Sequence, residues 1–406
     1  MAETATASSY TEERVTAAAR ERGEPDWLVD RRAEGARAFA ATPMPTPRLR
    51  PWKYTDVTAL EIDAFALIDG GISVEASAPD GAFAGMIADA LGGEHEAALR
   101  EHLGGLIAAT EGKFVAANAA QWRGGVFVHA TRAAVFEQPI VIEIDAPAGG
   151  AIFPRLLVVA EEQSELTIVL RHRSGDDAVI APGVIEVFCG AGSNVRMLID
   201  GRWGAETQEF TFARARLDRD AQLQISSIAI GGRLVKQTIE SLIEGEGAHS
   251  DIRGVALGDG DQRFDFVTLQ DHIGPRTTSK VQIKAALAGA SKSIYYGVTR
   301  VEETAAGAHA EQENRNLLLS RRAKADSDPV LEILTADVIR CGHAATVGPV
   351  DQEALFYLQS RGLAYRAALQ LLVSGFFSSV VEGIPMAGLE AELAETVSAK
   401  LATAEL

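Results

Sequence analysis

The stretch that organises this sequence is Pro329-Val-Leu-Glu-Ile-Leu-Thr-Ala-Asp-Val-Ile-Arg-Cys-Gly-His-Ala-Ala-Thr-Val-Gly348. It reads as two short β-runs joined by a turn, and the second run extends from Val338 to Val347. Cys341 and His343 stand two residues apart in that run, and residues i and i+2 of a strand point to the same face. We therefore expect a thiol and an imidazole side by side, each able to bind a soft metal or to act as an acid or base.

A purely structural role for this Cys–His pair is the alternative, because a single pair is often inert. The sequence has no CxxC or HxxxH motif, so it predicts no self-contained zinc or iron–sulfur site. It also has no Walker A sequence and no GxSxG elbow, and we expect the chain to bind no nucleotide and to be no enzyme.

Short β-runs follow one another from about residue 113 to 348, starting with Gly125-Val-Phe-Val-His and Ile140-Val-Ile-Glu-Ile. In their turns a small residue, a polar one and an apolar or small one recur, at 164, 193, 221, 248, 291, 308 and 323. These intervals lie near multiples of about 14 or 15 residues, the step expected when each strand and its turn climb one layer of a stack. We predict a mainly β fold with a right-handed parallel β-helix (solenoid) core; a large antiparallel sandwich is the alternative.

Helical patterns flank the predicted solenoid. The first 106 residues are rich in Ala, Glu and Arg and include a predicted helix from Ile87 to Leu106. Trp52, after a Pro-rich segment, is expected to be a packing anchor. Three more helices are predicted over 351–362, 365–381 and 389–402. We therefore divide the chain into a largely helical region 1–112, a β-helix core 113–348 and a helical region 349–406.

The second C-terminal helix is predicted to bury one face made of Ala367, Leu371, Leu372 and Phe376. Three helices of this size are too small to fold securely alone, so they must pack on the solenoid or on a partner. The polar run from Glu311 to Asn316 is interpreted as a solvated rung of the solenoid.

Composition restricts the class of protein. The chain has 406 residues, a net charge of −18 and two cysteines, which fits a cytoplasmic protein without a disulfide framework. The acidic charge argues against binding to nucleic acid or to anionic membranes. No apolar run is long enough to span a membrane, and the N-terminus lacks the features of a secretory signal.

A solenoid ends in an exposed rung, and an open strand edge invites pairing with another chain. The last predicted rung carries Cys341 and His343. An edge-to-edge dimer would therefore place the pair at a subunit interface.

Several motifs resemble the SufD family of the SUF iron–sulfur cluster assembly machinery. They are Glu313-Asn-Arg-Asn-Leu-Leu-Leu-Ser320, Pro329-Val-Leu-Glu-Ile333, Cys341-Gly-His343, Ala345-Thr-Val-Gly348 and Leu355-Phe-Tyr-Leu-Gln-Ser-Arg-Gly362, with Tyr295-Tyr-Gly-Val-Thr-Arg-Val301 and Pro51-Trp-Lys-Tyr-Thr-Asp56 in support. The related SufB family lacks the Asn-Arg-Asn-Leu-Leu-Leu-Ser run, and its members are longer. This sequence departs from the commonest SufD wording in the residues after the Cys and after the His, but it keeps both ligand types.

The resemblance implies a scaffold subunit of an ATP-dependent complex, with a β-helix core between helical regions. It implies pairing with a SufB-like subunit through the β-helix edge, or a weak homodimer when the chain is alone. A transient iron–sulfur cluster or iron would be shared with that partner at Cys341 and His343. Glu332 and Asp337 are candidate carboxylates for incoming iron, although a solvated role is the simpler reading.

The resemblance also implies docking of a SufC-like ATPase on the C-terminal helices, around Phe356, Tyr357, Arg361 and Phe376. Two other classes of function remain open from the residues alone. A carbohydrate-active β-helix enzyme would need clustered acids and aromatic platforms, and only 6% of the residues are aromatic. A purely structural interaction scaffold without metal chemistry is the closer alternative.

Overall fold

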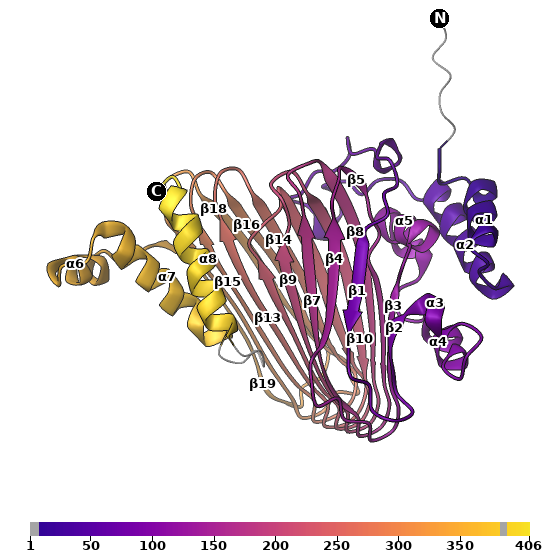
Figure 1. Ribbon diagram of the computed structural model, residues 1–406. Coiled ribbons are helices and arrows are strands. Elements are labelled where there is room, and N and C mark those ends of the chain that lie inside the picture. The colour runs from indigo at the N-terminus through magenta and orange to yellow at the C-terminus, as the bar shows by residue number, and fades with distance from the viewer. Residues whose placement is uncertain (1–7, 382–387) are drawn as a thin grey trace, which may run out of the picture.

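Two parallel sheets form the walls of a β-solenoid in the computed structural model, which describes residues 8–381 and 388–406 (Figure 1). Within these residues one sheet has nine strands in the order β1-β4-β7-β9-β11-β13-β15-β17-β19. The other has ten, in the order β18-β16-β14-β12-β10-β8-β6-β3-β2, with β5 beside β8. The predicted β-solenoid with helices at both ends is confirmed. The sandwich alternative is wrong, because the core strands of each sheet pair in parallel.

The strands are β1 (Gly71–Glu75), β2 (Phe83–Met86), β3 (Val126–Ala130), β4 (Ile140–Ala146), β5 (Gly150–Ala151), β6 (Arg155–Ala160), β7 (Glu165–Ser174), β8 (Val179–Cys189), β9 (Asn194–Arg202), β10 (Gln208–Leu217), β11 (Gln222–Ala229), β12 (Leu234–Ile243), β13 (His249–Gly258), β14 (Arg263–His272), β15 (Thr278–Leu287), β16 (Lys292–Val301), β17 (Ala308–Leu318), β18 (Lys324–Ile333) and β19 (Val338–Pro349). The helices are α1 (Glu12–Glu21), α2 (Asp26–Ala41), α3 (Ile87–Ala90), α4 (Glu96–His102), α5 (Lys113–Gln121), α6 (Gln352–Ser360), α7 (Tyr365–Val381) and α8 (Leu389–Thr403), with 3-10 turns η1 (Arg50–Trp52), η2 (Ile62–Ala64) and η3 (Ala109–Glu111).

Each coil of the solenoid contributes one strand to each sheet. Gln208 pairs with Leu234 and Lys292 with Lys324, and the coils are 26 to 32 residues long. This length is twice the step of about 14 or 15 residues that the turn triplets predicted. Alternate side chains of both sheets fill the space between them with a continuous apolar core, and the backbone groups of the inner strands are paired on both sides.

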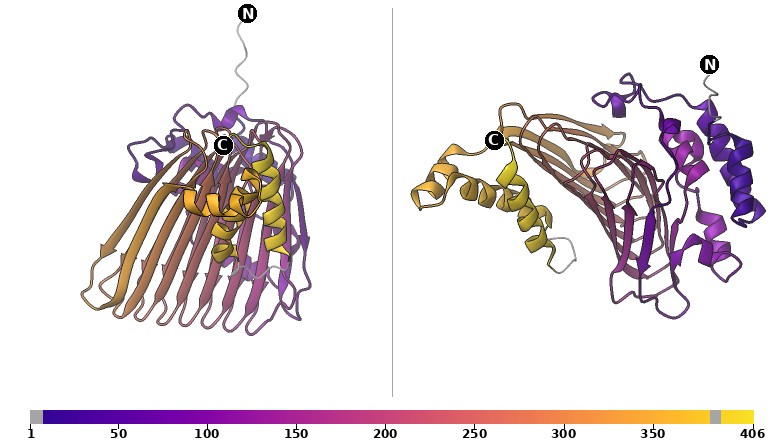
Figure 2. Two further views of the ribbon diagram at one scale, coloured as in Figure 1. Left: turned by 90° about the vertical axis from the view of Figure 1, so that its left-hand side faces the viewer. Right: turned by 45° about the horizontal axis from the view of Figure 1, so that its top comes forward.

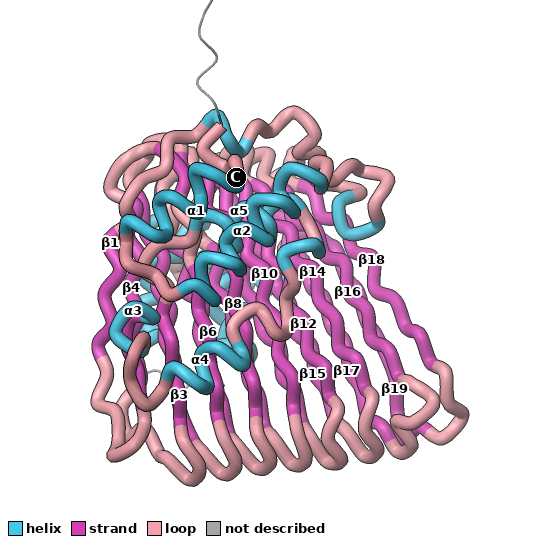
Figure 3. The backbone as a smooth tube through the Cα atoms, turned by 90° about the vertical axis from the view of Figure 1, so that its right-hand side faces the viewer, coloured by secondary structure: helices cyan, strands magenta, loops and turns pink. Residues whose placement is uncertain are grey.

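The N-terminal helices cover the outer face of the ten-stranded sheet at its early coils (Figure 3). Trp52 is 9% exposed and stacks on Phe114 of α5, with ring centroids 5.4 Å apart. Phe114 in turn stacks on Phe210 of β10 at 4.0 Å. The predicted packing role of Trp52 is therefore confirmed.

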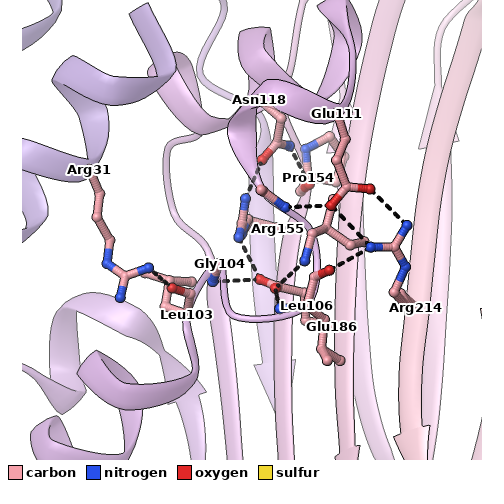
Figure 4. Close-up of polar contacts among 12 residues, drawn as sticks. Arg31, Leu103, Gly104, Leu106, Glu111, Asn118, Pro154, Arg155, Glu186 and Arg214 are labelled. Carbon is pink, nitrogen blue, oxygen red and sulfur yellow. Dashed lines mark hydrogen bonds and ion pairs between the residues drawn. The ribbon is translucent and has the colours of Figure 1, made fainter. Parts of the chain in front are cut away.

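A buried ion pair ties the same helices to the solenoid wall (Figure 4). Glu186 of β8 is fully buried, and its carboxylate accepts the backbone N–H groups of Gly104, Leu106 and Ile107 at 2.8 to 3.0 Å. Arg155 of β6 donates to the same carboxylate at 2.5 Å. A buried carboxylate is tolerated only when it is paired and hydrogen-bonded in this way. The loop between α4 and η3 is thereby fixed on β6 and β8.

The sequence prediction differs from the structure in three N-terminal places. The predicted helix from Ile87 to Leu106 is two short helices, α3 and α4, because Gly92 turns the chain with φ +74° between them. Strands β1 and β2, which were not predicted, pair antiparallel with β4 and β3 and extend the two sheets at this end. Helix α5 was also missed, and it lies within the range assigned to the β-helix core.

Helices α7 and α8 lie on the outer face of the nine-stranded sheet, and α6 projects away from it (Figures 1 and 2). Two lysines anchor α7 and α8 to this sheet. Lys284 of β15 donates to the carbonyl of Phe376 and the hydroxyl of Ser379 at 2.6 and 2.7 Å. Lys400 of α8 is bonded to the carbonyls of Ile230 and Leu257, at 2.5 Å each. No helix among the described residues is long and apolar enough to cross a membrane.

The range of α7 agrees with the prediction, but its predicted buried face is right only in part: Leu372 and Phe376 are partly buried and pack against the apolar cluster under the helix. Leu371 is 54% exposed and Ala367 is exposed. The fully buried positions are Ala368, Leu369, Val373, Phe377, Val380 and Val381. The helix is apolar nearly all round, so the sequence pattern did not fix which face meets the sheet.

Candidate functional site: the open end of the solenoid

The solenoid ends on β19, which pairs with β17 on one side. Its other edge carries no strand of the described chain, and β18 is the matching end of the second sheet. Figure 3 shows these two strands at the end of the solenoid that lies away from the N-terminal helices. The backbone N–H and C=O groups along this edge of β19 have no neighbouring strand, which is the geometry that accepts a strand from another chain.

Register places Cys341 and His343 on the inner face of this last rung. Cys341 is paired with Ala310 and His343 with Gln312 on β17. Both partners are buried, and the Gln312 side chain bonds inside the solenoid to Tyr295. Paired residues of neighbouring strands point to the same face. The thiol and the imidazole therefore face the solenoid interior at its open end.

The two side chains differ in environment. Cys341 is half-buried and packs against a small apolar cluster of Val301, Ala305 and Ala308. Burial raises the pKa of its thiol above the ordinary range. In the isolated chain the thiol is therefore protonated at neutral pH, and a metal that binds there must displace a proton.

His343 is exposed because no further rung lies below it within residues 8–381 and 388–406. On the outer face of the same strands β15, β17 and β19 lies a groove of about 360 Å³, whose walls include Lys280, Gln282, Glu311, Glu313 and Arg340. The groove is lined by charged side chains that partly neutralise one another, since Arg340 lies 3.3 Å from Glu311. The imidazole itself is reachable from solvent through the open end, because His343 is exposed in the isolated chain.

The two candidate carboxylates lie apart from this inner face. Glu332 is on β18 and forms an ion pair with Arg300 of β16 at 2.8 Å. It is paired in register with the same Arg300, so the two side chains share one face of the sheet. Asp337 is exposed in the turn before β19, and its backbone carbonyl accepts the N–H of Gly307. Within the described residues no three or more His, Cys, Asp or Glu side chains are grouped to hold a metal.

One part of the site was missed in the sequence. Gln312, Asn314 and Asn316 of β17 are 3%, 0% and 4% exposed, so the run that was interpreted as a solvated rung is half buried. Asn316 Nδ2 donates to Asn314 Oδ1 at 2.7 Å, and Asn314 Nδ2 donates to the carbonyl of Ile283 at 3.2 Å. The strict alternation of charged and amide residues from 311 to 316 is the signal that could have shown this, because a strand with charges outside puts its amides inside.

The second predicted surface divides between exposed and packed residues. Phe356 and Tyr357 on α6 are 72% and 56% exposed, and the guanidinium of Arg361 lies 5.2 Å from the Tyr357 ring. Leu363, just before α7, and Leu371, on α7, are also exposed apolar residues. We call these five residues the α6 patch. Phe376, in contrast, packs against the nine-stranded sheet, where Lys284 Nζ lies 4.9 Å from its ring.

Fold and site together define a class of protein: a β-solenoid scaffold with a free edge, a soft-ligand pair at that edge and helices that expose an apolar patch. Comparison with known proteins gives the family. The family model for "SUF system FeS cluster assembly, SufBD core domain" matches residues 142–376, so the chain belongs to this family.

The chain is 30% identical over 297 residues to the iron-sulfur cluster assembly protein SufD of Bacillus subtilis, covering 72% of this chain and 67% of that protein. It is 31% identical over 276 residues to an iron-sulfur cluster assembly SufBD family protein of Mycobacterium bovis, covering 66% of this chain and 69% of that protein. It is 27% identical over 304 residues to SufB of Bacillus subtilis, covering 72% of this chain and 63% of that protein.

The raised pKa of Cys341 predicts slow alkylation at neutral pH. The rate with iodoacetamide should still be rising at pH 9, because only the thiolate reacts and burial keeps its fraction small. The measurement is the rate of mass gain of the native chain between pH 6.5 and 9.5. The Cys341→Ser variant should gain no label while folded, since Cys189 is buried and its thiol pKa is also raised by burial. A rate that levels off below pH 8 would contradict this account.

Proposed function

We propose that this chain is a SufD-type scaffold subunit for iron–sulfur cluster assembly. In this proposal its free edge pairs with a SufB-like subunit, and Cys341 and His343 handle iron or a nascent cluster at the junction. The observation that carries the proposal is the position of a thiol and an imidazole on the inner face of an unpaired terminal strand. The SufD-like run from Glu313 to Ser320 and the greater identity to SufD than to SufB favour the SufD-type assignment.

The number of ligands explains why a partner is required. Imidazole and thiolate both suit iron and iron–sulfur species. This chain offers two such groups at the open end, whereas a cluster is usually held by four ligands. The remaining ligands must therefore come from the subunit that pairs with β19. The same pairing would exclude water from a site that is solvent-accessible in the isolated chain.

The α6 patch supports a second part of the proposal, docking of a SufC-like ATPase. Exposed aromatic residues with an adjacent arginine are typical of the central residues of protein interfaces. Leu355 is the buried residue of α6, so the rest of this helix is available to a partner. In our proposal Phe356, Tyr357 and Arg361 contact the ATPase, and Phe376 transmits its movement to the solenoid.

A path for that movement exists in the contacts of α7. Lys284 joins the carbonyl of Phe376 and the hydroxyl of Ser379 to β15, and β15 is separated from β19 by β17 alone. Nucleotide-driven dimerisation of the ATPase would pull on α6 and α7. The pull would reach the last rung through β15 and open the subunit interface around Cys341 and His343.

Replacing His343 tests the metal-handling part. The His343→Ala chain, coexpressed with its SufB-like and SufC-like partners and purified without oxygen, should form the complex in normal yield but lose most of its iron and acid-labile sulfide. His309→Ala is the matched control, because that half-buried histidine is on the outer face of the neighbouring strand β17. Unchanged iron and sulfide in His343→Ala would leave this chain as a structural scaffold without metal chemistry.

Replacing the aromatic residues of the α6 patch tests the docking part. Each of Phe356→Ala and Tyr357→Ala should weaken ATPase binding by about 2 kcal/mol, roughly 30-fold, if they are central contacts. Isothermal calorimetry with the purified ATPase measures this loss. Val135→Ala, which removes an exposed apolar side chain near the first coils, is the control and should bind normally. Wild-type affinity in both aromatic variants would rule out the patch as the docking site.

A further inference from the structure

The inward column of side chains that ends at His343 changes character at the last two rungs. In register order it consists of Met197, Ile225, Ile252, Val281, Gln312 and His343. Four apolar residues are thus followed by a buried amide and then by the imidazole. A buried amide in an apolar column is destabilising unless its hydrogen bonds are satisfied, so its presence directly above His343 calls for a reason.

Tyr295 fixes the orientation of the Gln312 amide. Gln312 Nε2 donates to the Tyr295 hydroxyl at 2.7 Å, and that hydroxyl lies 3.0 Å from Oγ1 of Thr268. Tyr295 is fully buried, and burial raises its pKa to about 12, so it stays protonated at neutral pH. The carbonyl oxygen Oε1 of the same amide faces Thr299, which also belongs to β16. Among the described residues its donor is the Thr299 hydroxyl at 3.5 Å, the outer limit of a hydrogen bond.

A glycine in the middle of β16 makes room for this arrangement. A Cβ at Gly297 would lie 1.8 Å from Gln312 Nε2 and 2.2 Å from the Tyr295 hydroxyl. Any other residue at 297 would therefore displace the contact between Tyr295 and Gln312. Glycine inside a strand is unfavourable for the sheet and often marks a close approach of another group. Here the approaching group is the amide that lies one rung above His343.

We propose that Gln312 is a positioning residue for His343: its Oε1 accepts the N–H of the imidazole and fixes which ring nitrogen is left free as a ligand. This proposal rests on the proposed function of His343. Gln312 and His343 are paired in register on the inner face of neighbouring strands. A metal-binding histidine usually donates its other ring N–H to a carbonyl or carboxylate, which sets the tautomer and the ring orientation. Tyr295 and Gly297 act on His343 only through Gln312: Tyr295 bonds to its amide, and Gly297 leaves room for that contact.

Nitrogen-15 NMR of the isolated chain tests the tautomer directly. In the wild type at pH 8, His343 should show one neutral tautomer, and Gln312→Leu should give a mixture of the two. Gln312→Glu keeps an acceptor oxygen and should restore the single tautomer. Gln282→Leu, on the outer face of β15, is the matched control and should leave His343 unchanged. An identical His343 nitrogen pattern in the wild type and Gln312→Leu would overturn the proposal.

Iron and sulfide content of the coexpressed complex gives the second readout. Gln312→Leu should weaken retention of iron by about 10-fold, as replacements of residues that orient a metal ligand commonly do. Gln312→Glu should retain it. If His343→Ala loses the iron and Gln312→Leu does not, the positioning role is wrong and the proposed function stands. If neither variant loses iron, the proposed function fails as well.

Discussion

The unpaired edge of β19 is the constraint on which the rest of the structure depends. Every inner strand of the solenoid has its backbone groups paired on both sides, and the first coils are closed by β1 and β2, which run antiparallel to the sheets. Helices α1 to α5 cover the outer face at that end. No comparable element closes the last coil within the described residues. The solenoid is therefore capped at its N-terminal end and uncapped at its C-terminal end, where the thiol and the imidazole lie.

The interior of the solenoid combines aliphatic layers with buried polar side chains. The early coils have an apolar interior built largely from aliphatic residues such as Ile140, Ile142 and Ile168. The last coils contain Tyr295, Gln312, Asn314 and Asn316, whose polar atoms are bonded mostly to one another and to backbone. Polar residues add little net stability to a core, and unsatisfied ones are destabilising. Buried polar side chains also occur in the middle coils, where Gln237 donates to Glu209 and accepts from Ser227, so hydrogen-bonded polar groups run through much of the interior and reach the open end.

How much of this followed from the sequence differs between elements. The parallel solenoid was predictable because each coil repeats one pattern, and the turn triplet preserves it over many coils. That Cys341 and His343 point to the same face of their strand followed from strand periodicity alone. The direction of that face, into the solenoid, needed the register with Ala310 and Gln312, which no local pattern contains. The buried face of α7 was predicted only in part for a related reason: a helix with apolar residues on most sides is oriented by what it packs against.

The packing contacts of Gly297 and Tyr295 also depend on groups that are distant in the sequence. Gly297 is surrounded by Tyr295 and by Gln312, which belongs to the other sheet. A glycine in a strand predicts a close approach but does not identify the approaching group. Phe376 is a related case: the family resemblance implied a docking role, the helical pattern predicted a buried one, and its ring lies 4.9 Å from Lys284 Nζ of β15.

Hydrogen exchange along β19 tests the central claim most directly, because it reports on the backbone groups of the free edge. The comparison is between the isolated chain, kept dilute enough to be monomeric, and its complex with the SufB-like subunit. The account predicts that amide exchange in β19 slows at least about tenfold on pairing, while β13, already paired with β11 and β15, stays unchanged. Equal exchange of β19 in the free and the paired chain would contradict it, because the partner would then bind elsewhere.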